Sequence, residues 1–511
     1  MKITRAHRWS ALAAVAGLLT LFAWAASSPL GSGPDDDFHN ASIWCGQGIR
    51  EGLCEQGSEP TTILVPGTLI TNSSCFASQP DNSGVCKENE NLLETSRVNL
   101  VGAVYPPVYY WTMSWLAGSD VVSSIVSMRI FNSILAVSLL LITVVALPKH
   151  LKRIPLLGYL GTAIPLGIFL TASINPSGWT YTSVLIFFAS MLGFFTTTER
   201  VKRVFFAAMS SISFVMGAGT REDTPAYLLL AGAVAWYLSD SKRNSVRTRI
   251  IFGTATAIGV VIFSFVAFSS QSFIGYFLRG FDWYGGGTTL GGTFKNVVTL
   301  PDLWVGSFGT WGLGWLDTPM PSSVWFVTFG IYFALVFGSV RNFSRKQSIA
   351  VVIVIFALTF IPLYTLAVNG LLVGQIVQPR YLLPLLALLL AAAVYRSSVD
   401  SGFVLSRGQM WTIAGGLFAA HLISLHTNLR RYLTGLDENQ VSLNFKMEWW
   451  WFERPLSDTV LWLSPNYVWL GGSLAFGVLL VSIWKLRSDL GFLTSAEQFR
   501  DREHVKNAEV N

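Results

Sequence analysis

Three consecutive carboxylates, Asp35, Asp36 and Asp37, lie next to His39 near the start of the chain, and we take these four residues as candidate catalytic groups. Adjacent carboxylates repel one another, so they destabilise the fold unless a cation, a catalytic role or hydrogen bonds use them. One of them could deprotonate a sugar hydroxyl as a general base. Asp36 and Asp37 could hold a divalent cation such as Mg²⁺ or Mn²⁺. The alternative is a solvated turn, because glycines and a proline precede the triplet.

Arg221, Lys295 and Arg380 are candidate ligands for a phosphate group. An arginine guanidinium can bind phosphate through two hydrogen bonds, whereas lysine binds it as a point charge. Arg221 and Arg380 fall at the ends of apolar segments, where the phosphate of a lipid would lie, although each could equally reach toward lipid headgroups. Arg129 falls inside an apolar segment, where an ionisable residue usually faces the bundle interior. An acid such as Asp120 is a candidate partner for it, and a purely structural role for Arg129 is the alternative.

Four more residues are candidates for substrate binding: Asp223, Trp315, Asp317 and Tyr381. Trp315 and Asp317 belong to a stretch rich in glycine and tryptophan, and an indole ring can stack on a sugar. A belt of aromatic residues at the membrane–water boundary would have the same composition. The sequence has no P-loop, HExxH or GxSxG motif. ATP-driven transport is therefore not expected.

The elements that must position these residues are membrane helices. Of the 511 residues, 51% are hydrophobic and 13% charged, whereas soluble domains carry about 25% charged residues. The mean hydropathy of +0.49 excludes an ordinary soluble enzyme and a disordered chain. An all-α polytopic membrane protein with about twelve transmembrane helices is predicted. The expected spans are residues 9–27, 121–147, 155–174, 179–197, 203–219, 224–239, 249–270, 322–340, 348–368, 381–396, 409–426 and 467–485.

The charges indicate how these spans are oriented. With the N-terminus inside, the cytoplasmic stretches hold 23 Lys and Arg against 8 Asp and Glu, and the rest of the chain holds 12 against 21. Basic residues in short loops favour the cytoplasmic side. We therefore predict that both termini are cytoplasmic. The net charge of +6 then reports membrane orientation, and it gives no support for nucleic acid as a partner.

All four cysteines fall in one hydrophilic window of 42 residues. They are Cys45, Cys54, Cys75 and Cys86. Their even number and tight clustering favour two disulfides and hence an extracytoplasmic loop. Of the three possible pairings, Cys45–Cys54 and Cys75–Cys86 is favoured because neighbouring cysteines close short loops. A zinc site is the competing interpretation, but the sequence has no CxxC pair.

The predicted spans divide the chain into eight segments. These are an N-terminal anchor (1–27), a large first outer loop with the cysteines and the acidic triplet (28–120), helices two to seven (121–270), an outer loop (271–321), helices eight to eleven (322–426), an outer loop (427–466), the last helix (467–485) and a cytoplasmic tail (486–511). The first segment could also be a cleaved signal peptide, but its apolar run of about 18 residues exceeds the usual 7–15. An uncleaved anchor is therefore preferred. The unusual polar residues map to the outer face, where we expect the active site.

Five short motifs follow one another along the chain. They are the Asp triplet, Tyr105 to Pro107, Asn175 to Gly178, Phe308 to Asp317, and Gln378 to Pro384. Together they resemble the bacterial predicted membrane protein family known as domain of unknown function 2142, over about residues 10–485. That family usually carries Asp-Glu-x-x-His, whereas this chain has Asp36-Asp37-Phe38-His39, with Asp for Glu and one residue fewer before His.

The family is similar in layout to the GT-C glycosyltransferases, which carry an acid just after the first helix and take sugars from polyprenyl-phosphate donors. The resemblance implies a GT-C-like fold, a base or metal ligand within the Asp triplet, and an outer-face arginine on the donor phosphate. It also implies an enzyme of the bacterial cytoplasmic membrane that transfers a sugar from such a donor to an envelope glycan or lipid acceptor. The expected partners are the donor, the acceptor and the lipid bilayer. Alternatives are a transporter or flippase of a lipid-linked glycan, with polar residues at mid-membrane, and a non-catalytic envelope assembly protein.

Overall fold

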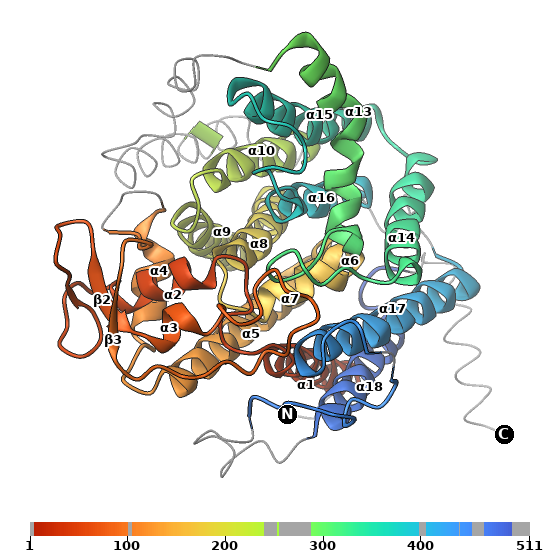
Figure 1. Ribbon diagram of the computed structural model, residues 1–511. Coiled ribbons are helices and arrows are strands. Elements are labelled where there is room, and N and C mark those ends of the chain that lie inside the picture. The colour runs from red at the N-terminus through yellow and green to blue at the C-terminus, as the bar shows by residue number, and fades with distance from the viewer. Residues whose placement is uncertain are drawn as a thin grey trace.

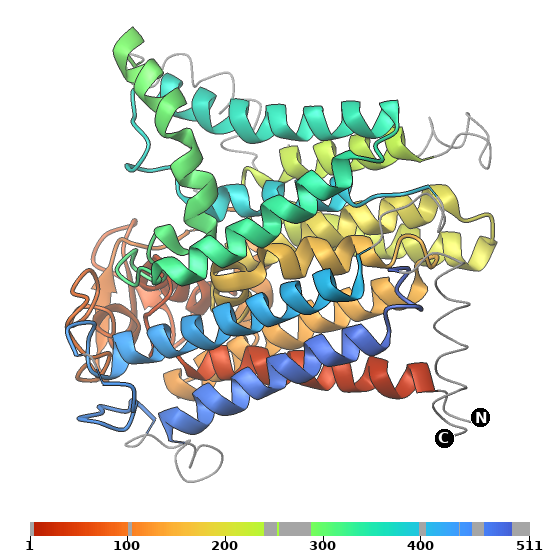
Figure 2. The same cartoon turned by 90° about the vertical axis from the view of Figure 1, so that its right-hand side faces the viewer.

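A bundle of long helices carries a small disulfide-bonded domain at one end (Figures 1 and 2). The computed structural model describes residues 5–100, 105–239, 253–254, 288–397, 405–438, 440–451 and 464–492. The helices of the bundle are α1 (Arg5–Ala26), α5 (Val121–Ala146), α6 (Arg153–Thr162), α7 (Ile168–Thr171), α8 (Pro176–Thr196), α9 (Arg200–Ala218), α10 (Thr224–Leu238), α13 (Leu290–Val305), α14 (Ser322–Val340), α15 (Arg345–Val368), α16 (Pro379–Ala393), α17 (Arg407–Leu433) and α18 (Pro465–Lys485).

Eight membrane-length segments in the described parts of the chain are apolar enough to cross a bilayer, which makes this a multi-pass membrane protein. They are α1, α5, the segment Arg153–Thr171 formed by α6 and α7, α8, α9, α14, α15 and α18. The expected spans 224–239 and 381–396 coincide with α10 and α16, which have 15 residues each and are therefore shorter than the roughly 20 that a span needs. The expected span 409–426 falls within α17, which is not among the eight. Almost all of 249–270 lies outside the described residues, so the number twelve stays a prediction, as does the GT-C-like arrangement.

Three helical segments form the centre of the bundle. The most apolar window of α8 is fully buried, and 94% of that of Arg153–Thr171 is buried, whereas α14, α15 and α18 bury one third of theirs. In α16, 14 of the 15 residues are buried. A helix that is apolar on every side belongs inside a bundle. The outer helices α9 and α10 pack against α8, and α1 packs against α18.

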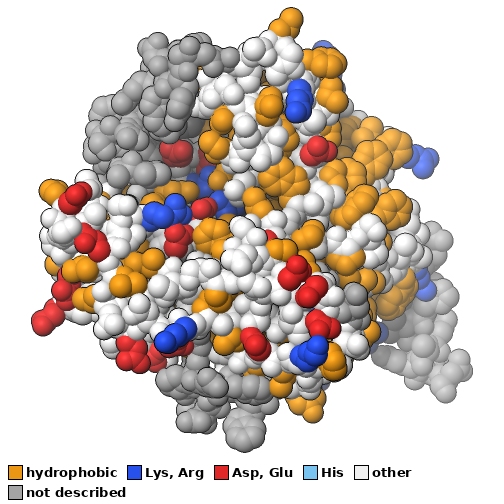
Figure 3. Space-filling view, viewed as in Figure 1, with side chains coloured by type: hydrophobic (Ala, Val, Ile, Leu, Met, Phe, Trp, Pro, Cys, Tyr) orange, Lys and Arg blue, Asp and Glu red, His pale blue; other side chains and the backbone are white. Residues whose placement is uncertain are grey.

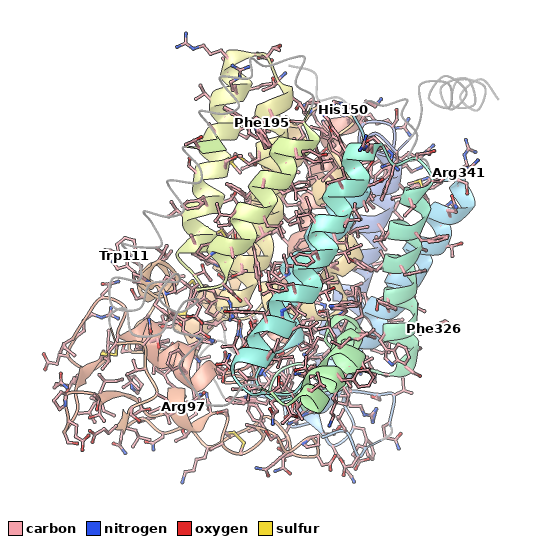
Figure 4. The ribbon with its side chains drawn as sticks, turned by 90° about the horizontal axis from the view of Figure 1, so that it is seen from above. Arg97, Trp111, His150, Phe195, Phe326 and Arg341 are labelled. Atoms are coloured by element: carbon pink, nitrogen blue, oxygen red, sulfur yellow. A yellow bond between two sulfur atoms is a disulfide. The ribbon has the colours of Figure 1, made fainter. Side chains whose placement is uncertain are left out.

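The small domain is built around a three-stranded antiparallel sheet of β1 (Glu55–Gln56), β2 (Ile63–Pro66) and β3 (Leu92–Thr95), in the order β1-β2-β3. In its register Gln56 pairs with Ile63, and Leu64 pairs with Glu94. Short helices α2 (Asp36–Trp44), α3 (Thr68–Thr71) and α4 (Pro107–Ser114) join it to the bundle. We call this end of the molecule the disulfide end. Arg97 lies there, whereas His150, Phe195 and Arg341 lie at the opposite end (Figure 4).

The disulfides are the expected ones. Cys45 is bonded to Cys54 and Cys75 to Cys86, with sulfur–sulfur distances of 2.02 and 1.97 Å. All four cysteines are used, so the zinc alternative is wrong. The two bonds join cysteines separated by 9 and 11 positions, in a domain whose sheet is too small to form a large core of its own.

Candidate functional site

The chain leaves α1 through a buried segment, Ser27 to Pro34, which we call the exit segment. Arg129 of α5 donates hydrogen bonds of 2.7–2.8 Å to three carbonyl oxygens there and at the end of α1, those of Ala25, Ser28 and Pro29. Asp120, the expected partner of Arg129, instead caps α5 by accepting from the Ser123 backbone N–H. That expectation was wrong. Arg129 satisfies carbonyls that the end of α1 leaves open, and it thereby fixes the direction of the exit segment.

Other elements hold the exit segment from different sides. Asn428 of α17 donates to the Ser27 carbonyl oxygen over 3.2 Å, and Tyr432 donates to that of Ser32 over 3.4 Å. The Trp315 indole N–H donates to the Gly31 carbonyl oxygen over 2.8 Å. The Asn175 amide, just before α8, donates to that of Pro34 over 3.1 Å. The place of the Asp triplet is therefore set by residues from four parts of the chain, and the indole N–H of Trp315 is used in this framework.

The Asp triplet begins α2, and its three carboxylates point to different partners. Asp35 has a left-handed backbone (φ 61°) and accepts from Nη2 of Arg380 over 2.7 Å. Asp36 is buried and accepts from the Gly33 backbone N–H over 2.8 Å. Asp37 accepts from Arg97, which also lies 3.6 Å from Asp35. The carboxylates are thus separated from one another by their partners.

This arrangement does not fit a divalent cation. Ca²⁺ and Mg²⁺ need several oxygen ligands directed at one point, whereas the oxygens of Asp35 and Asp37 face arginines and those of Asp36 face the interior. The described residues contain no group of three or more His, Cys, Asp or Glu side chains placed to hold a metal. We therefore assign no metal to Asp36 and Asp37.

Burial and neighbouring charges shift the pKa values of Asp35, Asp36 and His39 in different directions. Burial raises the pKa of Asp36 to about 7, although Arg129 opposes the shift. Burial alone would also raise the pKa of Asp35, but the adjacent Arg380 outweighs it and the pKa is lowered. Burial lowers the pKa of His39 to about 3, so its ring is neutral, with Nδ1 2.8 Å from the Tyr110 hydroxyl. Asp35, whose side chain is 40% exposed, is therefore the ionised carboxylate that a ligand can reach.

Arg221 and Arg380 both lie close to the aromatic ring of Tyr381. The guanidinium carbons of Arg221 and Arg380 lie 4.3 and 5.2 Å from the ring centre of Tyr381, distances at which a cation is attracted to a ring face. Arg221 also donates two hydrogen bonds of 3.0 Å to the carboxylate of Asp223. Basic side chains gather in a recess of this face, beside the disulfide-bonded domain (Figure 3). Seven residues were expected to bind phosphate or substrate, and four of them thus lie together: Arg221, Asp223, Arg380 and Tyr381.

Arg380 is the group in this cluster with unused hydrogen-bonding capacity. Its side chain is 5% exposed, and within the described residues its Nε and Nη1 have no hydrogen-bond partner. It lines a cleft together with Pro34, Trp311, Gly312 and Gly314. A buried charged donor without a partner destabilises the fold, and a phosphate or carboxylate oxygen would satisfy it. The Arg380 guanidinium therefore has the unused donors of an anion site.

Two expected site residues lie apart from this cluster. Lys295 is exposed on α13, and no contact among the described residues joins it to Arg221 or Arg380. Asp317 is buried and accepts from Arg431 over 2.7 Å and from the Ser78 backbone N–H over 3.1 Å. It therefore ties the disulfide-bonded domain to the last turn of α17.

The family comparison covers the part of the chain that builds the cluster. The family described as predicted membrane protein (DUF2142) matches residues 18–389, well over half of the chain. The chain belongs to this family. No curated protein and no solved structure matches it. In this DUF2142 protein the matched region contains Asp35, Arg97, Arg221 and Arg380, whereas Arg431 lies beyond it.

Sequence reasoning missed Arg97 and the part played by Tyr105. Arg97 bridges Asp35 and Asp37, and the Tyr105 ring lies 5.8 Å from the guanidinium of Arg221. Tyr105 belongs to one of the family motifs, so a signal was present, but nothing in it indicated Arg221 as the partner. Arg97 is 60 residues from its partner Asp37, and no local pattern indicates that pairing.

The opposite pKa shifts of Asp36 and His39 predict opposite effects of pH on stability. The pKa of Asp36 rises from 3.8 to about 7 on folding, so its contribution falls as pH rises through that window. The pKa of His39 falls from 6.5 to about 3, so its contribution rises with pH over that window. Between about pH 4 and 6.5 the two effects oppose each other. Relative to the native protein, Asp36→Asn is expected to gain stability as pH rises, and His39→Gln to lose it, by at most about 1.4 kcal/mol per pH unit.

Melting temperatures of the purified protein in detergent, measured from pH 4 to 8, test this expectation. Glu59→Gln, a surface substitution in the same domain, should give a curve parallel to that of the native protein. Parallel curves for Asp36→Asn and His39→Gln as well would contradict the assigned protonation states.

Proposed function

We propose that this protein is an integral membrane glycosyltransferase. It transfers a sugar from a polyprenyl-phosphate-linked donor to an envelope glycan or lipid acceptor at the outer face of the bacterial cytoplasmic membrane. The observation that carries the proposal is the pairing of a reachable carboxylate, Asp35, with a buried arginine, Arg380, whose other donors have no partner among the described residues. Sugar transfer from a phosphate needs a group that accepts the acceptor's proton and a cation that receives the departing phosphate.

The reaction can be followed atom by atom. The acceptor hydroxyl oxygen forms a bond to the anomeric carbon as the bond from that carbon to the phosphate oxygen breaks. Asp35 takes the hydroxyl proton, and the phosphate leaves with the bonding electrons. Arg380 and Arg221 would stabilise the new negative charge on that phosphate. Asp36 and His39 are buried and would position α2 without contacting substrate.

The position of the cluster in the bundle supports a substrate with a lipid tail. Asp35 follows α1, Arg221 lies between α9 and α10, and Arg380 begins α16, so all three lie where helices end. The positive-inside rule would place this end of the bundle outside the cytoplasm. A phosphate anchored to a polyprenyl chain would arrive at this depth from the bilayer.

The orientation can be tested separately from activity. Ser442 lies at the disulfide end. The thiol introduced by Ser442→Cys is therefore expected to react with a membrane-impermeant maleimide in intact spheroplasts. Thr198 lies between α8 and α9, at the opposite end. The thiol introduced by Thr198→Cys is expected to react only after the membrane has been permeabilised. The native protein is the control, because all four of its cysteines are in disulfides. The reverse labelling pattern would place the candidate site in the cytoplasm and would contradict the proposal.

The direct test is transfer by the purified full-length protein. It should move labelled sugar from at least one polyprenyl-phosphate donor to an acceptor in an envelope fraction, and Asp35→Asn should serve as the inactive comparison. Absence of transfer from every donor, with melting showing that the protein is folded, would argue strongly against an enzyme.

One cavity in the described part of the bundle favours the enzyme over a transporter. The cavity between α1, α5, α6 and α18 is lined mainly by apolar side chains such as Leu21, Leu140 and Leu160. A flippase for a glycan would need polar groups along a path through the membrane. A non-catalytic assembly protein remains distinguishable by phenotype, because Asp35→Asn would then leave the envelope glycans unchanged.

A further inference from the structure

We propose that the Asp35 carboxylate occupies the place of an anionic ligand on Arg380 in the free protein, so that a phosphate group binds by displacing it. This inference rests on the proposed function and deepens it, because it states how the same site admits its phosphate and when Asp35 becomes free to act.

The first argument is the geometry of Arg380. Asp35 contacts only Nη2, which also lies 3.2 Å from the Tyr381 hydroxyl. A guanidinium binds an anion best through two parallel hydrogen bonds, and Asp35 makes only one of them. Nε and Nη1 stay without partners inside the described structure. The contact therefore neutralises the charge of Arg380 while leaving most of its donors for a better ligand.

The second argument is that Asp35 can leave Arg380 without losing a cation. Arg97 lies 3.6 Å away from it, and the side chain of Arg97 is 55% exposed. Asp35 also has a left-handed backbone, a conformation that L-residues other than Asn and Asp rarely adopt. A small rotation toward Arg97 would keep the carboxylate paired.

The third argument is charge balance. The cluster contains three arginines and three aspartates that pair with them. They are Arg97, Arg221 and Arg380 with Asp35, Asp37 and Asp223. The neighbouring His39 is neutral because burial lowers its pKa to about 3, and burial raises the pKa of Glu222, beside Arg221, to about 7. Within the three pairs the positive and negative charges are equal in number, so an added phosphate is favoured most where it replaces one of the aspartates.

Displacement would also time the chemistry. Arg380 is the neighbour that most lowers the pKa of Asp35, so moving Asp35 away from Arg380 makes it a stronger base. The carboxylate thus gains basicity only when a phosphate lies on Arg380. When the phosphate product departs, Asp35 returns to Arg380 and the site is closed to chemistry again.

Binding of farnesyl phosphate, a short polyprenyl monophosphate, to full-length protein in nanodiscs of uncharged lipid tests the displacement. Asp35→Asn is expected to bind it about tenfold more tightly than the native protein, which corresponds to about 1.4 kcal/mol. Asp37→Asn is the matched control, because it removes the same charge from a neighbouring carboxylate that does not contact Arg380. Its gain in affinity for farnesyl phosphate should stay below about threefold. Arg380→Gln should abolish the binding.

Unchanged or weaker binding by Asp35→Asn would overturn the inference. Asp35→Ser provides a second neutral side chain should the asparagine variant fail to fold, as judged by its melting temperature. A parallel titration with inorganic phosphate, and nanodiscs containing phosphatidylglycerol, separate the ligand sources. Tighter binding of farnesyl phosphate assigns the site to a lipid-linked phosphate, and tighter binding of inorganic phosphate alone assigns it to the free ion. If phosphatidylglycerol competes equally well with farnesyl phosphate and inorganic phosphate, the site on Arg380 binds lipid headgroups. Displacement of Asp35 holds for each of these three ligand sources.

This experiment does not measure sugar transfer. A tenfold gain in affinity without any transfer would leave the anion site standing and overturn only the proposed enzyme. Sugar transfer by the native protein without a gain in the affinity of Asp35→Asn would support the enzyme and overturn the displacement.

Discussion

Asp35→Asn is expected to lower the rate of sugar transfer by about 100-fold to 10,000-fold, the range found when a general base is removed. Asparagine keeps the size of the side chain and can still lie near Arg380, so the loss would come from the missing proton acceptor. The decrease should appear in kcat. The KM for the donor should stay the same or fall, because the competing charge on Arg380 is gone. Initial rates against labelled donor concentration measure both constants.

The comparison with Asp36→Asn makes this result specific. Asp36 is buried against Gly33, so its replacement should change the melting temperature more than the rate. Glu59→Gln on the surface should leave both unchanged. Severe loss of activity in Asp36→Asn together with near-native activity in Asp35→Asn would show that Asp35 is not the general base.

Arg431→Met is expected to destabilise the protein by about 3–5 kcal/mol, the usual cost of removing one partner of a buried ion pair. The Arg431 side chain is fully buried and that of Asp317 is 5% exposed. The substitution leaves the Asp317 carboxylate in the interior without its cation. It also removes hydrogen bonds of 2.7 Å to the carbonyl oxygens of Phe76 and Asn82. Unfolding of the purified protein in mixed micelles at increasing SDS measures the loss.

An exposed ion pair nearby provides the control. Lys446 and Glu438 lie 3.0 Å apart with side chains that are 67% and 29% exposed. Lys446→Met should cost about 0–1 kcal/mol. Adding Asp317→Asn to Arg431→Met removes the unpaired charge and should recover part of the loss. Equal losses for Arg431→Met and Lys446→Met would show that the Asp317–Arg431 pair contributes no more than a surface contact.

Hydropathy predicted the long helices because a bilayer selects for about 20 apolar residues at a time. Both disulfides were also predicted, since neighbouring cysteines in one hydrophilic loop have few alternatives. The short α10 and α16 coincide with expected spans because burial among other helices has the same apolar signature as contact with lipid. What distinguishes the two environments is the packing partner, and composition does not record it.

The candidate site was predicted in its residue types and only partly in its pairings. Asp35, Arg221, Arg380 and Tyr381 each carry a local signal, namely charge or aromaticity at the end of an apolar segment. The Asp317–Arg431 pair joins residues 114 positions apart, and neither position shows that its partner will be the other. The three carboxylates of the Asp triplet have different partners, and the first of them, Asp35, has a left-handed backbone. Hydrophobic periodicity reveals neither feature.

The exit segment also has a consequence for the order in which the protein is made. Asn428 and Tyr432 hold residues that precede them by about 400 positions. Synthesis proceeds from the N-terminus, so the ribosome has produced the acidic triplet long before α17 exists to hold it in place. A nascent chain that has inserted its first helices therefore carries Asp35 without the framework that sets its position. The site is completed only after α17 has been made, and chains that stop before α17 lack the contacts of Asn428 and Tyr432.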